Sequence, residues 1–198
     1  MQAQLNLPAP YQPHAGLVAA FEACPLVAIL RGVTPADAAD HGRALYEAGF
    51  RIVEVPLNSP QPFDSIAAIR HALPPDAIVG AGTVLQAEFV HDVKQAGGEL
   101  IVMPHADPDV VRAAKSLAMA CAPGVATPTE AFIALKNGAD VLKMFPAEQL
   151  GCQVVKAWRA VIAHEVPLLP VGGITPDNMG PFLSAGANGF GLGSALFK

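Results

Sequence analysis

With 198 residues, the chain is about the size of one domain and is long enough to bury a sizeable core. Hydrophobic residues make up 52% and charged residues 15%, a composition that excludes a disordered chain. The formal net charge is -5 and no lysine and arginine residues cluster, so the electrostatic footprint of a nucleic-acid-binding protein is missing.

Residues 1–16 have neither the basic nor the apolar region of a secretion signal, and no later run approaches the ~18 apolar residues that a membrane span needs. We therefore expect a cytoplasmic protein that binds no membrane. The 3 cysteines lie far apart and form no C-x-x-C pair, which indicates reduced, structural thiols. The 6 histidines show no local metal motif, so we expect no metal, although a site assembled from distant residues stays open.

Short apolar runs, rich in β-branched residues, predict eight strands along the chain. A segment with helical spacing of apolar residues follows each run, so the repeating unit is a strand and then a helix. The predicted strands are residues 26–31, 51–56, 77–82, 100–104, 119–124, 140–146, 167–173 and 189–194.

Five helix starts are marked by the same device, an N-cap side chain followed by proline at the first helical position. The device recurs at intervals of roughly 24 residues or twice that, as expected for repeated strand–helix units. Thr127 together with Glu130 also predicts a capping box. The five pairs are Thr34-Pro35, Ser59-Pro60, Asp107-Pro108, Thr127-Pro128 and Thr175-Pro176.

Strands that are apolar throughout, each followed by a helix, predict a parallel sheet buried on both faces. Eight evenly spaced units favour a closed (β/α)8 TIM barrel over an open doubly wound sheet. Residues 14–24 are expected to form an extra helix that closes the bottom of the barrel, after an N-terminal extension over residues 1–13. We therefore expect one α/β domain over residues 1–198.

Four polar residues stand near the C-terminal ends of predicted strands, where barrel enzymes carry their active sites. Within its strand, Lys143 shares one face with Phe145. A buried ion pair without function is one explanation for a lysine and a glutamate in such strands. The cost of burying both charges favours a functional site instead. The four residues are Arg31, Glu54, Thr83 and Lys143.

Desolvation in a barrel mouth lowers the pKa of a lysine and frees its amine to attack a carbonyl carbon. The position of Lys143 therefore predicts Schiff-base chemistry, with Glu54 transferring protons directly or through a water. His105, in the loop after residues 100–104, is also expected to face the mouth, but a lone loop histidine is more often solvated than catalytic.

Glycines and a serine after the last two predicted strands indicate a phosphate site. Many barrels hold a phosphate there, between backbone amides and the N-terminus of a short helix. Gly189 and Gly191 lie inside a predicted strand, where close packing explains them as well. The predicted phosphate-binding residues are Gly172, Gly173, Gly193 and Ser194.

Five motifs, taken together and in this order, resemble the class I 2-keto-3-deoxy-6-phosphogluconate/galactonate aldolases over residues 25–198. They are PLVAILRG, VEVPLNSP, VGAGTVL, KMFPAE and VGGITPDN. The resemblance implies a (β/α)8 aldehyde-lyase of carbohydrate metabolism that uses no metal or cofactor. It also implies a homotrimer whose partner is a small phosphorylated keto-deoxy sugar acid.

Residue by residue, the resemblance implies that Lys143 forms the Schiff base with the C2 ketone and that Glu54 is the general acid/base. Arg31 and Thr83 would contact the pyruvyl portion, and Phe145 would pack against the intermediate. The glycines and the serine named above would hold the phosphate. The implied reaction is retro-aldol cleavage to pyruvate and glyceraldehyde 3-phosphate, with the lysine iminium as electron sink while the C3–C4 bond breaks.

Asn58 and Val171 bear on the substrate. The phosphogluconate members of the family carry arginine and threonine at these positions, whereas Asn58 and Val171 resemble the phosphogalactonate version. The resemblance thus implies 2-dehydro-3-deoxy-6-phosphogalactonate as substrate, in galactonate degradation. The lost hydroxyl donor at Val171 removes a hydrogen bond near the cleaved bond, which is expected to alter the preference between C4 epimers.

Other functions stay open from the sequence. The enzyme could act on the gluconate epimer or on both epimers. A phosphate-binding barrel isomerase or epimerase could use the same glycines, but it needs no lysine inside a strand. A non-catalytic sugar-phosphate sensor would keep the phosphate site and tolerate loss of the lysine and glutamate, so the presence of both residues counts against it. The spacing of the histidines and aspartates gives a metal-dependent aldolase no support.

Overall fold

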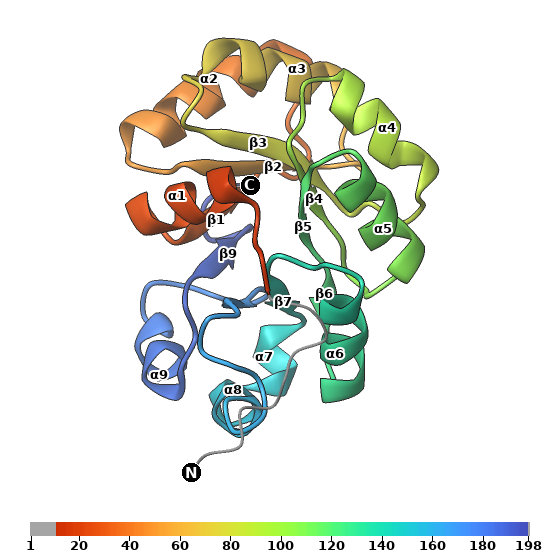
Figure 1. Cartoon of the computed structure of the whole chain (residues 1–198). Coiled ribbons are helices and arrows are strands. Elements are labelled where there is room, and N and C mark those ends of the chain that lie inside the picture. Colours follow the sequence, from red (N-terminus) through yellow and green to blue (C-terminus); the bar gives the residue numbers. More distant parts are fainter. Residues whose placement is uncertain (1–10, 198) are drawn as a thin grey trace.

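A curled parallel sheet forms the framework of the molecule (Figure 1). The computed structural model describes residues 11–197. Six strands follow the order β5-β4-β3-β2-β1-β9, and three more follow the order β6-β7-β8, with parallel pairing throughout. The strands are β1 (Leu26–Ile29), β2 (Ile52–Pro56), β3 (Ile78–Gly82), β4 (Leu100–Val102), β5 (Ala120–Ala122), β6 (Gly124–Val125), β7 (Leu142–Met144), β8 (Leu168–Pro170) and β9 (Phe190–Leu192).

The predicted count of eight strands is wrong for the described residues, because the run 119–124 is divided into β5 and β6. Pro123 lies between them and has no N–H to donate to a ladder, which explains the break. The Lys143 N–H nevertheless donates to the Pro123 carbonyl at 3.0 Å. At the other junction, a single parallel bridge pairs Val171 with Gly191.

Helices cover the outer side of the curled sheet, whereas α1 packs against its inner side (Figure 1). α1 confirms the predicted extra helix at 14–24, while residues 1–10 of the predicted extension lie outside the described residues. No helix in residues 11–197 is long and apolar enough to cross a membrane. The helices are α1 (Ala15–Ala23), α2 (Pro35–Glu47), α3 (Pro62–Ala72), α4 (Glu88–Gln95), α5 (Pro108–Ser116), α6 (Pro128–Lys136), α7 (Ala147–Leu150), α8 (Cys152–Trp158) and α9 (Met179–Ala185).

Two apolar clusters bury both faces of the sheet, as the all-apolar strands predict. Successive strand residues alternate between the clusters: Val27 belongs to the inner cluster and Ala28 to the outer, and Ile52 and Val53 repeat the pattern. The inner cluster also contains Leu17 of α1, so this helix closes one end of the space inside the curl.

Three of the predicted helix starts are confirmed. Thr34 is the N-cap residue of α2, but its hydroxyl donates to the Asp37 carboxylate at 2.7 Å and accepts no backbone N–H of the helix. Asp107 caps α5 by accepting from the Asp109 N–H at 2.8 Å. Thr127 begins α6 with the predicted capping box.

The other two predicted starts, at Ser59 and Thr175, are wrong. α3 begins at Pro62, because the Ser59 hydroxyl is taken by a tertiary bond and accepts from the Gly32 N–H at 2.9 Å. α9 begins at Met179, because the Asn178 side chain folds residues 173–178 into a turn. These side chains thus stabilise loops at the carboxyl ends of strands.

Candidate functional site

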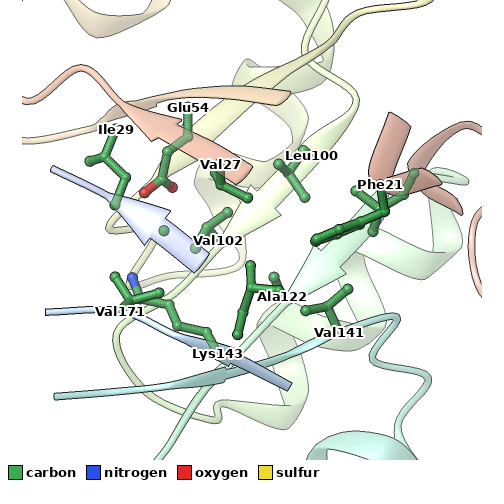
Figure 2. A pocket seen from close by; sticks show the side chains of 13 residues that line it. Phe21, Val27, Ile29, Glu54, Leu100, Val102, Ala122, Val141, Lys143 and Val171 are labelled. Atoms are coloured by element: carbon green, nitrogen blue, oxygen red, sulfur yellow. The ribbon is translucent and has the colours of Figure 1, made fainter. Parts of the chain in front are cut away.

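A cavity lies inside the curl of the sheet and holds both predicted catalytic side chains (Figure 2). Its walls are apolar apart from Glu54 and Lys143, and its volume of ≈ 20 Å³ is enough for about one water molecule. Figure 2 shows the Lys143 nitrogen and the Glu54 carboxylate at one end and Phe21 of α1 at the other. The two ionisable groups therefore share one cavity.

Lys143 is the middle residue of β7 and pairs with Gly124 on β6 and Leu169 on β8. Its exposed fraction is 7%, and its Nζ lies 5.1 Å from the centroid of the Phe145 ring. Burial lowers the pKa of Lys143; the Glu54 charge opposes this shift and the Arg31 charge adds to it. The net effect favours the neutral, nucleophilic amine.

Glu54 is the middle residue of β2 and pairs with Ile29 on β1 and Gly80 on β3. Only 2% of it is exposed, and its Oε2 has no hydrogen-bond partner within residues 11–197. Burial raises the pKa of Glu54 against the opposing charges of Lys143 and Arg31. A buried carboxyl with a free oxygen is suited to giving and taking protons.

Lys143 and Glu54 form no ion pair within 4.0 Å, and neither takes part in the ion pairs found among residues 11–197. A buried structural ion pair would require close contact and satisfied hydrogen bonds. The two groups are thus more than 4.0 Å apart, in a cavity with space for about one water molecule. The arrangement can therefore form an imine and move protons beside it.

Arg31, Asn58 and Thr83 meet at the rim of the sheet, next to the cavity. Arg31 Nη1 donates to Asn58 Oδ1 at 2.5 Å, and Nη2 donates to Thr83 Oγ1 at 3.5 Å. Thr83 has φ 55°, a left-handed conformation that is unusual for a β-branched residue. The rim is thus held in one arrangement that presents a guanidinium group to the solvent.

Two further predicted residues flank the amine. Phe145 follows β7 and is half-buried. Val171 follows β8, is 7% exposed and lines the cavity, and Figure 2 shows it beside the Lys143 nitrogen. A side chain at position 171 can therefore contact whatever is bound to Lys143.

Two of the glycines that are predicted to hold the phosphate, Gly172 and Gly173, have positive φ angles. Gly172 has φ +99° and Gly173 φ +69°, which other residues rarely adopt. A Cβ on Gly173 would lie 2.7 Å from Glu148 Cβ, and the positive φ would strain any other residue there. The helix N-terminus predicted next to them is wrong, since α9 begins only at Met179.

Gly193 and Ser194 lie just after β9. The Gly193 carbonyl accepts the N–H groups of Leu196 at 2.8 Å and Phe197 at 2.9 Å, and Ser194 is exposed. These two residues therefore form an exposed turn at the end of their strand.

The remaining candidates lie apart from the cavity. His105 has a side chain 44% exposed, its Nε2 is 3.9 Å from Asp107 Oδ2, and it does not line the cavity. Cys24, Cys121 and Cys152 are free, as predicted, and burial raises the pKa of Cys121. Within residues 11–197 no three side chains of the histidine, cysteine, aspartate and glutamate types gather as a metal site.

Several cavity residues were missed from the sequence. Phe21 and Leu17 of α1 close the far end, and Ile29 lines the wall. Helical periodicity alone does not say which strands a helix meets, so only the predicted position of α1 across the barrel bottom pointed to them. The close packing suggested for Gly191 is confirmed, since a Cβ there would lie 2.7 Å from Val171 Cγ2.

Comparison with known proteins gives a consistent set of relatives. The family model of the KDPG and KHG aldolases matches residues 18–198. The chain is 47% identical over 174 residues to 2-dehydro-3-deoxy-6-phosphogalactonate aldolase of Escherichia coli (strain K12). The matched region covers 88% of this chain and 85% of the relative. Identity to 2-dehydro-3-deoxy-phosphogluconate aldolase of Zymomonas mobilis is 34% over 148 residues, covering 75% of this chain and 70% of that one.

A solved structure described as native KDPGal has the same fold, with a TM-score of 0.86. It is 47% identical in sequence, and the match covers 88% of this chain and 84% of that chain. The curled α/β architecture is therefore shared with a relative of clear sequence similarity.

Proposed function

Because this chain belongs to the KDPG and KHG aldolase family, we propose that it cleaves 2-dehydro-3-deoxy-6-phosphogalactonate to pyruvate and D-glyceraldehyde 3-phosphate. The observation that carries the proposal is that Lys143 and Glu54 line the same cavity. Burial there lowers the pKa of Lys143 and raises the pKa of Glu54, so both shifts disfavour the charged forms. The galactonate substrate is favoured because the relative named for it is 47% identical, against 34% for the gluconate enzyme.

The reaction begins at the Lys143 amine. The neutral Nζ adds to the C2 ketone of the substrate, and Glu54 supplies the proton with which the C2 hydroxyl leaves as water. The product of this step is an iminium ion at C2. Its positive charge next to C3 is the electron sink for the cleavage.

Cleavage follows when a carboxylate at Glu54 takes the proton of the C4 hydroxyl. The C3–C4 bond breaks, its electron pair moves toward the iminium nitrogen, and the aldehyde leaves. Protonation of the enamine at C3 and addition of water at C2 then release pyruvate and return the amine of Lys143. Atoms and charges balance with protons and one water.

The rim and the glycines would hold the two ends of the substrate. Arg31, with Asn58 and Thr83 as acceptors, keeps further guanidinium N–H groups for a carboxylate. Phe145 would pack against the intermediate. The backbone amides around Gly172, Gly173, Gly193 and Ser194 would bind the phosphate.

We also propose that the strands close into a (β/α)8 barrel within one domain over residues 1–198, in which β5 and β6 form one strand that is interrupted at Pro123. The Lys143–Pro123 hydrogen bond and the Val171–Gly191 bridge, one at each junction of the two sheets, support closure. The family resemblance predicts that the protein is a homotrimer and that it is cytoplasmic. It also predicts that the protein needs no metal and binds only small molecules. These points stay predictions.

The test of the proposed function is a coupled pyruvate-release assay on the two C4-epimeric phosphates, with and without EDTA. We expect faster release from the galactonate epimer, and EDTA should not slow it. Equal rates on both epimers would show a dual-epimer enzyme, and no release from either would reject the aldolase.

Val171→Thr is expected to shift the ratio of kcat/KM values toward the gluconate epimer by about tenfold, since it places a hydroxyl group beside the Lys143 nitrogen at nearly constant volume. Val171→Ala is the matched control, because it changes the size of the side chain without adding a donor. The same epimer assay measures both variants. An unchanged ratio in Val171→Thr would mean that position 171 does not determine the C4 preference.

A further inference from the structure

Gly82, the last residue of β3, lies against the carboxyl group of Glu54. A Cβ at this position would be 2.2 Å from Glu54 Oε2, 2.6 Å from its Cδ and 3.0 Å from its Oε1. Real Cβ atoms do not approach so closely, so the Glu54 side chain occupies the space that any other residue at position 82 would fill.

The backbone of Gly82 does not itself require glycine. Its φ is outside the left-handed region, and it sits in regular parallel pairing opposite Pro56 of β2. Its carbonyl accepts the Leu57 N–H at 2.8 Å, as a strand residue of any type could do. The missing side chain, and not a special turn, is therefore what this position provides.

Other strand glycines in the described chain meet different neighbours. A Cβ on Gly80 would lie 2.0 Å from the Leu100 carbonyl, so that glycine allows two strands to approach. A Cβ on Gly191 would meet the apolar side chains of Val171 and Ile29. Gly82 differs from both because the group that needs the space is the ionisable side chain of the cavity.

We propose that Gly82 is a positioning residue for the aldolase reaction: its missing side chain leaves the space in which the Glu54 carboxyl group is held, buried and apart from Lys143. This inference rests on the proposed function and extends it to a residue outside the reacting groups. The carboxyl lies over the strand backbone with Oε2 free of hydrogen bonds within residues 11–197. A methyl group at position 82 displaces it from that place.

The kinetic test compares Gly82→Ala with Gly180→Ala, a control in α9 where an added Cβ meets nothing within 4 Å. We expect Gly82→Ala to lower kcat by about 10²-fold with little change in KM, since positioned proton transfer contributes 10²–10⁴-fold. Borohydride with pyruvate should still label Lys143 in this variant, but more slowly than in the wild type, because Glu54 also supplies a proton for imine formation. Wild-type kcat in Gly82→Ala would overturn the proposal.

Glu54→Asp supplies the rescue test, because the shorter side chain frees part of the space that the new methyl group needs. Adding Gly82→Ala to Glu54→Asp should then lower kcat by less than about tenfold, against about 10²-fold in the wild type. This difference between the two backgrounds is the coupling expected of residues in contact. An equal loss in both backgrounds would mean that Gly82 acts independently of the Glu54 carboxyl.

Thermal melting separates this inference from the proposed function, because it needs no substrate. Gly82→Ala should lower Tm in the wild type and lower it much less in Glu54→Ala, where the colliding carboxyl is absent. If Gly82→Ala alone does not fold, folding of the double variant supports the proposal. An equal loss of Tm in both backgrounds overturns it, even if the wild type proves to be an aldolase.

Discussion

Lys143→Ala is expected to abolish pyruvate release, lowering kcat/KM by about 10⁴-fold or more, as loss of a reacting nucleophile does. Lys143 is the buried amine of the cavity, whereas Lys115 is engaged by Asp140 at 2.7 Å in an ion pair. Lys143→Arg should be equally inactive, because a guanidinium keeps its proton in proteins and cannot attack the ketone. The coupled pyruvate assay measures both variants.

Lys136→Ala is the control for this prediction, since Lys136 is exposed on the last turn of α6. Borohydride added with pyruvate should reduce an imine in the wild type and in Lys136→Ala, and peptide mass analysis should place the adduct on Lys143. Retained turnover in Lys143→Ala, or an unmodified wild-type protein, would contradict the Schiff-base mechanism.

The pH profile follows from the direction of the Lys143 shift. An ordinary lysine has a pKa of about 10.4 and is charged at neutral pH. Burial lowers the pKa of Lys143, so the neutral amine is available at pH values where an exposed lysine is protonated. We therefore expect the labelling rate to fall as pH drops through the lowered pKa.

Much of the fold could be predicted because each strand is specified by its own local sequence. Apolar runs bounded by glycine and proline located the strands, and Asp107 and Thr127 marked helix starts through contacts within a few residues. Ser59 and Thr175 carry the same local signal and yet precede loops. The Ser59 hydroxyl is bonded to Gly32, which is distant in sequence, and the Asn178 side chain closes a turn around Thr175. A local N-cap pattern does not predict either contact.

The proposed catalytic pair stands out in the sequence because a charge inside an apolar strand is costly. Lys143 and Glu54 stood out for that reason, and the alternation of strand residues placed them inside the curl. The Arg31–Asn58 hydrogen bond and the space at Gly82 depend on side chains that are not neighbours in sequence. Such contacts follow only from the register between strands, which the periodicity of single strands does not provide.

Glu54→Gln is expected to lower kcat by about 10²–10⁴-fold, because an amide of nearly the same shape cannot exchange the proton that the C–C cleavage requires. The variant should fold as the wild type does, because the amide matches the carboxyl group in shape and volume.

The same substitution has a second, independent consequence at Lys143. The Glu54 charge raises the pKa of Lys143 against the effect of burial, so its removal lowers that pKa further. Borohydride labelling with pyruvate should be slower in Glu54→Gln at every pH, because Glu54 supplies a proton for imine formation. The decline of labelling with falling pH should nevertheless begin at a lower pH than in the wild type. Glu47→Gln, an exposed residue at the end of α2, is the control for both measurements. A labelling profile that does not move, together with wild-type kcat, would show that the carboxyl of Glu54 neither transfers protons nor acts on the amine across the cavity.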